Sequence, residues 1–392
     1  MIRLAYIDPY AVPDTRVASL QILQNVDAFA RHDMQVFLVT PTSHTSAESL
    51  LGRSVSKGVI FSPLDDPRGK WYFPFNTQKI FFLRAFRWLK HNPVDVIYTR
   101  NLKTARFFLS KNLGIPVIFE SHEIFAQSFK ESHDLSHVKN QRKYEALLKN
   151  ERFVYQNSAA IVVLTSFLEE DIRRNYNVST PCIISPDGVD SLAVDAVPTP
   201  ATSPSPSPSP CSIFYLGSLH PWKGIPTAIS AMRHVTGATL TIAGGNEEQI
   251  ATLSTLALQE GVADKIHFLG YVNPLNRFQE ISRHDICILP LTKTSIASRY
   301  TSPLKLFEYM AMGKTIVISD LPSIREVVDE SSVFFAESEN SDVLGRVLQH
   351  VVDNRDDTKK RADTALLLSK NFTWDHRAQQ ISRTVHHLLL KN

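Results

Sequence analysis

Short apolar runs alternate with longer stretches of helical periodicity along most of the chain. The runs are rich in Val and Ile, which suits strands that are buried on both faces of a parallel sheet. They fall into two groups, so we expect an α/β protein with two doubly wound, Rossmann-like domains. The first group comprises residues 4–7, 36–39, 59–61, 94–98, 117–119, 160–164 and 182–184. The second comprises residues 213–216, 238–242, 266–269, 286–289 and 315–318.

A low-complexity Ser-Pro tract over residues 198–210 separates the two groups, and such a segment forms neither a ladder nor a helix. We expect an N-terminal domain over 1–195, a linker over 196–211 and a C-terminal domain over 212–372. The last helix, over 373–392, is a candidate to cross back to the first domain. Parallel sheets bind ligands beyond the carboxyl ends of their strands, so two such sheets facing one another predict an interdomain cleft.

Residues 298–313 place a cation at the start of a helix. Ser302 is expected as the N-cap, Pro303 as the first helical residue and Lys305 as the third. The helix dipole disfavours a lysine there unless an anion is bound. One interpretation is a phosphate site, with Glu308 accepting hydrogen bonds from a hydroxyl-rich ligand. The other is a surface helix with a solvent-directed lysine, and this run alone does not decide between them.

A second lysine stands in the same relation to a helix. Lys223-Gly224 follows the strand over 213–216 and the loop that holds Gly217 and Ser218. Two such lysines in one domain favour a shared diphosphate site. Gly244-Gly245 follows the next strand and predicts a close approach of the backbone to a ligand, although a glycine pair is more often only a turn.

In the first domain, polar residues follow the ends of two expected strands. His122 is a candidate to bind a sugar hydroxyl or to carry a proton, and the alternative is a histidine that hydrogen-bonds a backbone carbonyl. Arg100 either binds an anionic acceptor or pairs with Glu120 or Glu123. The sequence leaves both alternatives for Arg100 open.

Composition excludes several classes of function. The formal charge of +3 gives no reason to expect a nucleic-acid partner, and three widely spaced cysteines predict neither a disulfide framework nor a zinc site. There is no Walker lysine loop, no GxGxxG, no hydrolase elbow and no carboxylate pair with metal-ligand spacing. We therefore expect no metal and no cofactor, and a leaving phosphate stabilised by Lys223, Lys305, Arg299 and helix amides.

Residues 51–150 carry 17 basic and 8 acidic residues, a local surplus of +9. The helix expected over 77–90 has basic residues on one side and aromatic residues largely on the other. It covers a sheet or lies on an anionic membrane, and its place directly before a strand favours the sheet. With no signal peptide and no spanning run, we expect a cytoplasmic protein, with peripheral contact at the inner face of the membrane as an open alternative.

These residues resemble the family-four glycosyltransferases of the two-domain GT-B fold, also described as glycosyltransferase group 1. The strongest match is residues 301–320 with Ile324-Arg325-Glu326, and residues 216–224 resemble the diphosphate-binding loop of the family. Residues 185–190 resemble its Pro-Asn-Gly-Val-Asp run, and His122 matches a histidine beside the transferring sugar. The resemblance implies transfer of a hexosyl unit, with retained configuration and without a metal, from a nucleotide diphosphate sugar to a glycan or lipid-linked acceptor. Such a reaction fits the biosynthesis of a cell-surface polysaccharide.

The resemblance and the strand-end positions together give the candidate roles. The catalytic candidates are His122, Tyr300 and Glu308, of which Glu308 holds the donor ribose. The donor-binding candidates are Gly217, Ser218, Lys223, Gly244, Arg299, Ser302, Leu304, Lys305 and Glu308. The acceptor-side candidates are Arg16, Arg100 and Glu120.

Three positions depart from the family. Tyr300 stands where the family's Glu-x7-Glu motif has its first glutamate, and Ser218 stands where an arginine is usual. The glycine-rich loop after the first strand is replaced by residues 8–16, in which Arg16 offers a cation in place of glycine amides. Two other functions stay open: a sugar-nucleotide epimerase of the same fold, and a nucleotide-sugar-binding partner that has lost catalysis together with the glutamate.

Overall fold

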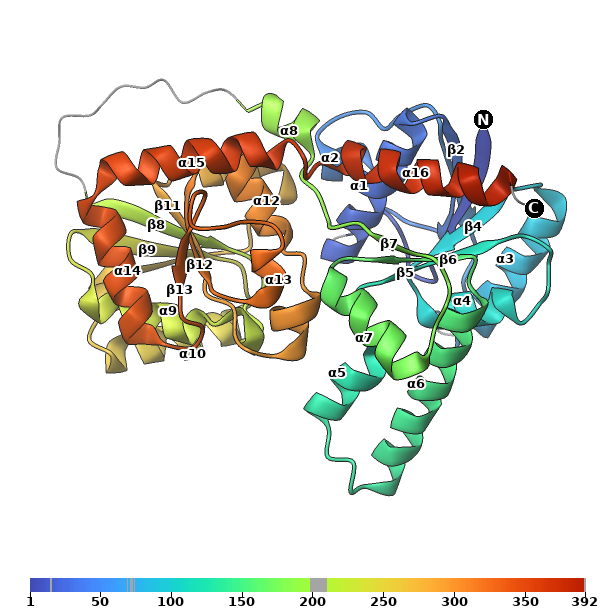
Figure 1. Ribbon diagram of the computed structural model, residues 1–392, viewed down its shortest axis with the longest axis horizontal. Coiled ribbons are helices and arrows are strands. Elements are labelled where there is room, and N and C mark those ends of the chain that lie inside the picture. Colours follow the sequence, from blue (N-terminus) through green and yellow to red (C-terminus); the bar gives the residue numbers. More distant parts are fainter. Residues whose placement is uncertain (15, 69, 71–72, 74, 198–209, 391–392) are drawn as a thin grey trace. The chain divides into compact units, whose positions relative to one another are not determined.

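The computed structural model describes residues 1–14, 16–68, 70, 73, 75–197 and 210–390. The chain forms two compact units (Figure 1). The first unit comprises Met1–Pro186 and Trp374–Asn392, and the second comprises Asp187–Thr373. The two-domain α/β prediction is confirmed.

The first unit is built on a parallel sheet of seven strands in the order β3-β2-β1-β4-β5-β6-β7. The order reverses between β1 and β4, and ligands of doubly wound sheets bind beyond the strand ends at such a point. The strands are β1 (Ile2–Ile7), β2 (Met34–Pro41), β3 (Val59–Leu64), β4 (Val96–Thr99), β5 (Val117–Ser121), β6 (Ala160–Val163) and β7 (Cys182–Ile184). The helices are α1 (Val17–Arg31), α2 (Glu48–Leu51), α3 (Lys79–His91), α4 (Leu102–Leu109), α5 (Phe125–Ser132), α6 (Val138–Asn157), α7 (Ser166–Tyr176) and α16 (Trp374–Leu390).

The second unit has a parallel sheet of six strands in the order β10-β9-β8-β11-β12-β13, which reverses between β8 and β11. The strands are β8 (Cys211–Leu216), β9 (Ala238–Ala243), β10 (Ile266–Gly270), β11 (Ile286–Leu289), β12 (Thr315–Ser319) and β13 (Phe334–Ala336). The α-helices are α8 (Ser191–Asp195), α9 (Ile225–Ala231), α10 (Glu247–Gln259), α11 (Arg277–Ser282), α12 (Leu304–Ala311), α13 (Pro322–Arg325), α14 (Ser341–Asp353) and α15 (Arg355–Ser369). One-turn helices are η1 (Pro221–Lys223), η2 (Met232–His234), η3 (Ala263–Lys265), η4 (Pro274–Asn276) and the π-helix η5 (Ile296–Tyr300).

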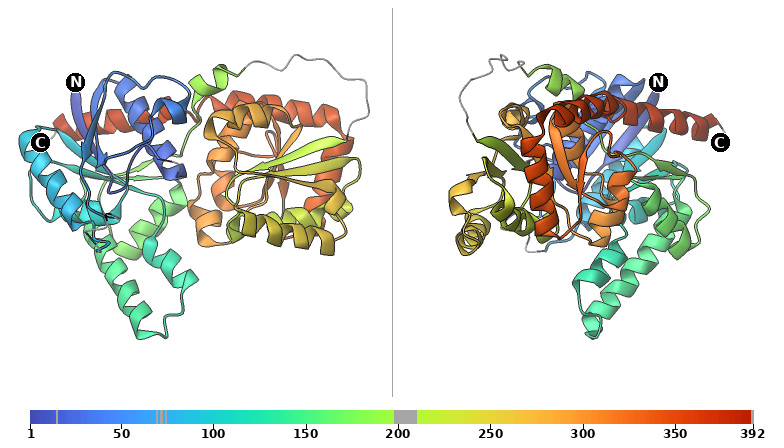
Figure 2. Two further views of the ribbon diagram at one scale, coloured as in Figure 1. Left: turned by 180° about the vertical axis from the view of Figure 1, so that it is seen from behind. Right: turned by 60° about the vertical axis from the view of Figure 1, so that its left-hand side comes forward.

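Within each unit, helices cover both faces of the sheet (Figure 2). All of the strands expected from the sequence are present. The structure adds β13, whose three residues are too few to show a periodicity in the sequence.

Helix α3 decides whether the basic and aromatic segment over 77–90 covers the sheet or lies on a membrane. Its Phe81, Phe82, Ala85 and Leu89 are buried in the core of the first unit against β1 and β2 residues such as Val39. The apolar side of this helix is therefore not available to a membrane, and the sheet-covering interpretation is confirmed. In the described part of the chain, no helix combines the length and the apolar character needed to cross a bilayer.

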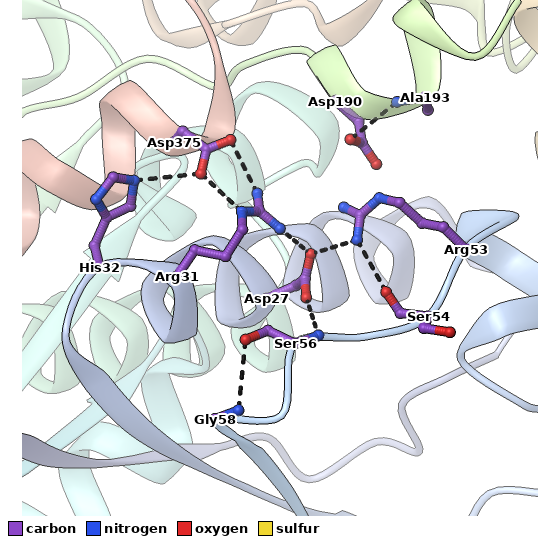
Figure 3. Close-up of polar contacts among 10 residues, drawn as sticks. All are labelled: Asp27, Arg31, His32, Arg53, Ser54, Ser56, Gly58, Asp190, Ala193 and Asp375. Atoms are coloured by element: carbon purple, nitrogen blue, oxygen red, sulfur yellow. Dashed lines mark hydrogen bonds and ion pairs between the residues drawn. The ribbon is translucent and has the colours of Figure 1, made fainter.

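The last helix, α16, belongs to the first unit and packs on α1. Arg31 at the end of α1 holds Asp375 of α16 with both ends of its guanidinium, Nε to Oδ1 at 2.9 Å and Nη2 to Oδ2 at 3.0 Å (Figure 3). The same guanidinium pairs with the fully buried Asp27, which Arg53 also contacts at 2.7 Å. A buried carboxylate needs such partners, so α1 and α16 share one ionic network.

The unit boundary lies before the expected residue 195. Residues 187–195 belong to the second unit because Val189 forms a parallel bridge with Thr373 and its N–H donates to Phe372 O at 2.9 Å. The N–H of Asp187 likewise donates to Ser302 Oγ in the second unit. Of the expected linker over 196–211, Cys211 already starts β8, and residues 198–209 lie outside the described part.

Candidate functional site

The loops at the switch point of the second sheet pack closely on one another. A Cβ at Gly244, where φ is +121°, would stand 1.9 Å from Gly217 O, and a Cβ at Gly224, where φ is +70°, would stand 1.7 Å from Pro290 O. Both glycines are therefore required by loop-to-loop contact. The close approach of Gly244 to a ligand stays a prediction.

Lys223 lies at the end of η1, between these loops. Its Nζ stands 3.7 Å from the centre of the Trp222 ring, which is a cation–π contact. Burial, with an added contribution from the charge of Lys305, lowers the pKa of Lys223 to about 8. Two ammonium groups thus repel each other at this point, and a bound anion would remove that cost.

The start of α12 differs from the expectation. The helix begins at Leu304 with Pro303 as its N-cap, so Lys305 is the second helical residue. Ser302 does not cap the helix, because its Oγ accepts the N–H of Asp187 at 2.8 Å. The expected Ser302 cap was wrong: a local pattern of Ser before Pro could not show that a residue 115 positions away uses the hydroxyl.

Glu308 is buried between two cations. Its Oε1 accepts from Arg277 Nε at 3.0 Å and its Oε2 from Lys305 Nζ at 2.6 Å. Only 5% of Glu308 and 4% of Arg277 are exposed. Arg277 at the start of α11 was not predicted, since no sequence pattern links it to α12.

Three cations lie around one carboxylate at the carboxyl end of β8 and the start of α12. The cations are Lys223, Lys305 and Arg277, the carboxylate is Glu308, and the surplus is two positive charges (three minus one). Helix α12 is tied to β8 because the N–H of Leu216 donates to Tyr309 Oη at 2.9 Å. This arrangement suits a ligand with two negative charges.

The remaining donor-site candidates lie in η5, in the loop after β8 and at the start of α12. Arg299 and Tyr300 lie in the π-helix η5, and Tyr300 is buried with 2% of its surface exposed. Ser218, after β8, is exposed, and its carbonyl accepts from Tyr215 Oη at 2.8 Å. Leu304 is the first residue of α12. Single-turn π-helices occur frequently at functional sites.

A second polar centre lies in the first unit, around Glu120 at the end of β5. Its carboxylate, only 3% exposed, contacts Arg377 of α16 at 3.0 Å, His122 at 2.5 Å and Asn25 of α1 at 3.4 Å. Tyr98 Oη of β4 also donates to it. Burial alone would raise the pKa of Glu120, but Arg377 in the first place, then His122 and Arg100, hold it well below its ordinary range.

His122 is held at both ring nitrogens. Because Glu120 is ionised and can only accept, His122 Nε2 carries the proton and donates to Glu120 Oε1. Arg100 Nη2 lies 3.2 Å from Nδ1 and donates to it, so Nδ1 keeps a lone pair. The contacts assign the neutral Nε2–H tautomer.

Arg100 has partners other than Glu120 and Glu123, and Arg16 pairs within its own loop. Arg100 donates to Gln21 Oε1 at 3.1 Å and to His122, and no contact with Glu120 or Glu123 is among those that the structure gives for its described side chain. Arg16 precedes α1 and pairs with Asp14 at 2.5 Å. The acceptor-side role of both residues stays a prediction.

No group of three or more His, Cys, Asp or Glu side chains with metal-binding geometry occurs among the described residues. The polar centre of each unit consists of cations and their partners.

Comparison with known proteins identifies the family. The model of "Glycosyltransferase Family 4" matches residues 19–191, and that of "Glycosyl transferases group 1" matches residues 210–354. The chain is a glycosyltransferase of the group 1 and family 4 type. No curated protein matches its sequence significantly.

Solved structures show that this glycosyltransferase has the GT-B fold. A sucrose-phosphate synthase from Thermosynechococcus elongatus matches with a TM-score of 0.78 and 14% identity over 100% of both chains. HepE from Anabaena, in complex with UDP-glucose, matches with a TM-score of 0.72 and 15% identity over 99% of this chain and 100% of its own. WaaG, a glycosyltransferase involved in lipopolysaccharide biosynthesis, matches with a TM-score of 0.67 and 13% identity over 99% of both chains.

Proposed function

We propose that this glycosyltransferase moves a hexosyl unit from a nucleotide diphosphate sugar to an acceptor hydroxyl, with retained configuration and without a metal. The observation that carries the proposal is the surplus of two positive charges formed by Lys223, Lys305 and Arg277 around Glu308. A diphosphate would neutralise this surplus. HepE, which has the same fold, binds UDP and UDP-glucose, so a uridine nucleotide is the first donor to test.

The contacts of Glu308 suggest how the donor is held. Arg277 keeps Oε1, while Lys305 on Oε2 is the mobile partner because its charge is also needed by the diphosphate. When Lys305 turns to the phosphates, Oε2 becomes free to accept a ribose hydroxyl. One lysine movement thereby serves both the ribose and the diphosphate.

The leaving group is stabilised without a divalent ion in this proposal. Negative charge develops on the diphosphate as the glycosidic bond breaks, and Lys223, Lys305 and the first amides of α12 are the groups placed to meet it. His122, whose ring is held by Glu120 and Arg100, is the candidate to orient the sugar or the acceptor hydroxyl.

The acceptor is proposed to be a glycan or a lipid-linked glycan of the cell surface. WaaG, a match in fold, is involved in lipopolysaccharide biosynthesis, which supports this class of product. The half-buried Arg100, whose hydrogen bonds go to neutral groups, favours an acceptor that carries a negative charge.

Donor binding is the direct test. UDP and UDP-glucose are expected to raise the thermal midpoint of the protein, because a ligand of the folded state stabilises it according to its affinity. Lys223→Met is expected to weaken UDP binding on the order of tenfold or more, since a charged hydrogen bond to phosphate is lost. Lys293→Met is the matched control, because Lys293 lies in the same unit and is exposed at 56% of its side chain.

Turnover separates the remaining alternatives. Release of UDP from UDP-glucose in the presence of an acceptor extract, unchanged by EDTA, would support transfer without a metal. An epimerised nucleotide sugar formed without acceptor would instead show an epimerase. Binding without turnover would show that the chain with Tyr300 is a non-catalytic binding protein, and equal UDP affinity in Lys223→Met would refute the donor site itself.

A further inference from the structure

Arg377 occupies an unusual place in the first unit. It lies in the first turn of α16, directly after the chain has returned from the second unit, and only 2% of it is exposed. Nothing in the local sequence around it suggests a functional role. A buried guanidinium is costly unless its donors are satisfied, so its partners indicate what it does.

Its partners join two separate segments of the first unit. Nη1 donates to the carbonyl oxygens of Ser185 and Pro186, the latter at 3.1 Å, and these are the last two residues before the chain leaves the unit. Nη2 lies 3.0 Å from Oε1 of Glu120. Arg377 therefore connects the point where the chain leaves and re-enters the unit with the carboxylate beside His122.

The ion pair determines the protonation of Glu120. The groups that face this carboxylate are Tyr6 of β1, Tyr98 of β4, Arg100 after β4, His122 after β5, Asn25 of α1 and Arg377. Tyr6, Tyr98 and Asn25 are neutral, and Arg100 acts only over a longer distance. Among the influences that oppose burial and keep the carboxylate ionised, Arg377 is the largest.

An ionised Glu120 has one consequence for His122. The carboxylate can only accept a hydrogen bond, so it requires the proton of the imidazole on Nε2. A protonated Glu120 could donate as well as accept, and the imidazole could then adopt either tautomer. The charge of Arg377 is thereby transmitted to His122 through a single shared carboxylate.

We propose that Arg377 is a positioning residue, which acts from the returning helix α16 by fixing the Glu120 carboxylate and, through it, the tautomer and orientation of His122. The catalytic consequence rests on the proposed function, in which His122 lies beside the reacting groups. The structural part, the state of His122, does not depend on it.

The first measurement observes His122 directly. In protein labelled with ¹⁵N-histidine, the His122 signals are identified by their loss in His122→Asn. In the wild type we expect a single tautomer with the proton on Nε2, because the ionised Glu120 can only accept a hydrogen bond from it. In Arg377→Gln, which retains a donor for the two carbonyl oxygens but lacks the charge, we expect the two nitrogen shifts to become intermediate.

Two further variants complete the comparison. Arg377→Lys keeps the charge and is expected to restore the single tautomer. Arg383→Gln is the matched control, because Arg383 is an exposed residue of the same helix. If Arg377→Gln does not fold, Glu120→Gln breaks the same ion pair from the other side and is expected to abolish the single tautomer. An unchanged His122 spectrum in the folded variant would overturn the proposal.

Kinetics provide the second readout. With UDP-glucose as donor, Arg377→Gln is expected to lower kcat on the order of tenfold and to move its pH profile, since a misplaced group costs rate rather than binding. The KM for UDP-glucose is expected to stay unchanged, because the proposed donor residues belong to the other unit. If kcat and the pH profile of Arg377→Gln equal those of the wild type, Arg377 has only a structural role. Absence of turnover in the wild type would refute the proposed function and leave the spectroscopic result intact.

Discussion

At the scale of single residues, Glu308 is notable for the unequal partners of its two oxygens. Arg277 is buried and donates from a fixed guanidinium, whereas a quarter of the Lys305 side chain is exposed and its ammonium group is flexible. A planar, buried arginine is suited to a permanent contact, and a lysine is suited to an exchangeable one. In the proposed donor site, Arg277 therefore stays on Glu308 when Lys305 turns to the diphosphate.

Arg277→Met tests this division of roles. Without Arg277, Lys305 is the cation that remains in contact with the buried Glu308 among the described residues, so it is less available to a diphosphate. We expect the affinity for UDP, measured by titration calorimetry, to fall on the order of tenfold. Arg283→Met, which removes an exposed arginine just after the same helix, is expected to leave it unchanged. Equal affinities in both variants would show that Arg277 matters only for folding.

Glu151 of α6 is a buried carboxylate that has no ion pair with a described residue. It accepts the N–H groups of Phe125 and Ala126, at 2.5 and 3.2 Å, and the hydroxyl of Tyr176 at 2.6 Å. Burial outweighs these hydrogen bonds and raises the pKa of Glu151 to about 7. Because Glu151 caps α5, which directly follows the His122 loop, its protonation affects the support of that loop.

The sign of the resulting pH dependence follows from the raised pKa. The folded state binds a proton that the unfolded chain releases near 4.5, so stability from this group falls as pH rises from 4.5 to 7, by roughly 3 kcal/mol in all. Asp8, with a pKa raised to about 6 by burial, acts in the same direction. Urea denaturation at several pH values should show this slope reduced in Glu151→Gln. An equal slope in the variant would argue that Glu151 has an ordinary pKa.

At the scale of elements, the position of α12 depends on the hydroxyl of Tyr309. This fully buried group accepts the N–H of Leu216, the last residue of β8, and so fixes the helix against the strand that leads to Gly217. Burial holds the pKa of Tyr309 well above its usual value, so the hydroxyl stays neutral. The contact links the two segments that carry Lys305 and Lys223.

Tyr309→Phe leaves the N–H of Leu216 without this partner. We expect a loss of about 1–3 kcal/mol in the free energy of unfolding, the cost of a buried unsatisfied donor, together with weaker UDP binding. Tyr215→Phe is a suitable comparison, since its hydroxyl bonds the carbonyl of Ser218 and leaves α12 untouched. A loss of stability without any change in UDP affinity would show that Tyr309 anchors the helix but does not support the donor site.

The elements were largely predictable from the sequence, whereas the partners within the sites were not. Residues 117–119 of β5 and 316–318 of β12 are apolar and β-branched or aromatic, and that composition is a local property. Lys305 and Glu308 were found because they lie on one short helix. Arg277, Arg377 and the Asp187 partner of Ser302 come from distant segments, and only the fold brings them together.

At the scale of the whole molecule, the first unit is discontinuous in sequence. Its last element, α16, is joined to α1 by Asp375, which contacts Arg31 and His32. The hydrogen bonds from Arg31 and the charges of Arg31 and His32 outweigh burial and hold the pKa of Asp375 below its usual value. The ionised carboxylate is thus part of what keeps α16 in place.

Asp375→Asn weakens this attachment. We expect a loss of about 1 kcal/mol, because the network is partly exposed, and faster amide hydrogen exchange in α16 than in the wild type. Exchange in the strands of the second unit should not change. Asp363→Asn, at an exposed position of α15, serves as the control. Unaltered exchange in α16 would mean that its apolar contacts with α1 suffice.

The same discontinuity has a consequence for the order in which the protein is made. The ribosome completes residues 187–373 before it synthesises α16. Until then the nascent first unit lacks Arg377, the ion-pair partner of Glu120. The second unit, continuous in sequence, can fold in the meantime. During translation the N-terminal part of this glycosyltransferase is therefore expected to be the last to reach its final structure, in the reverse of the order in which the two units emerge.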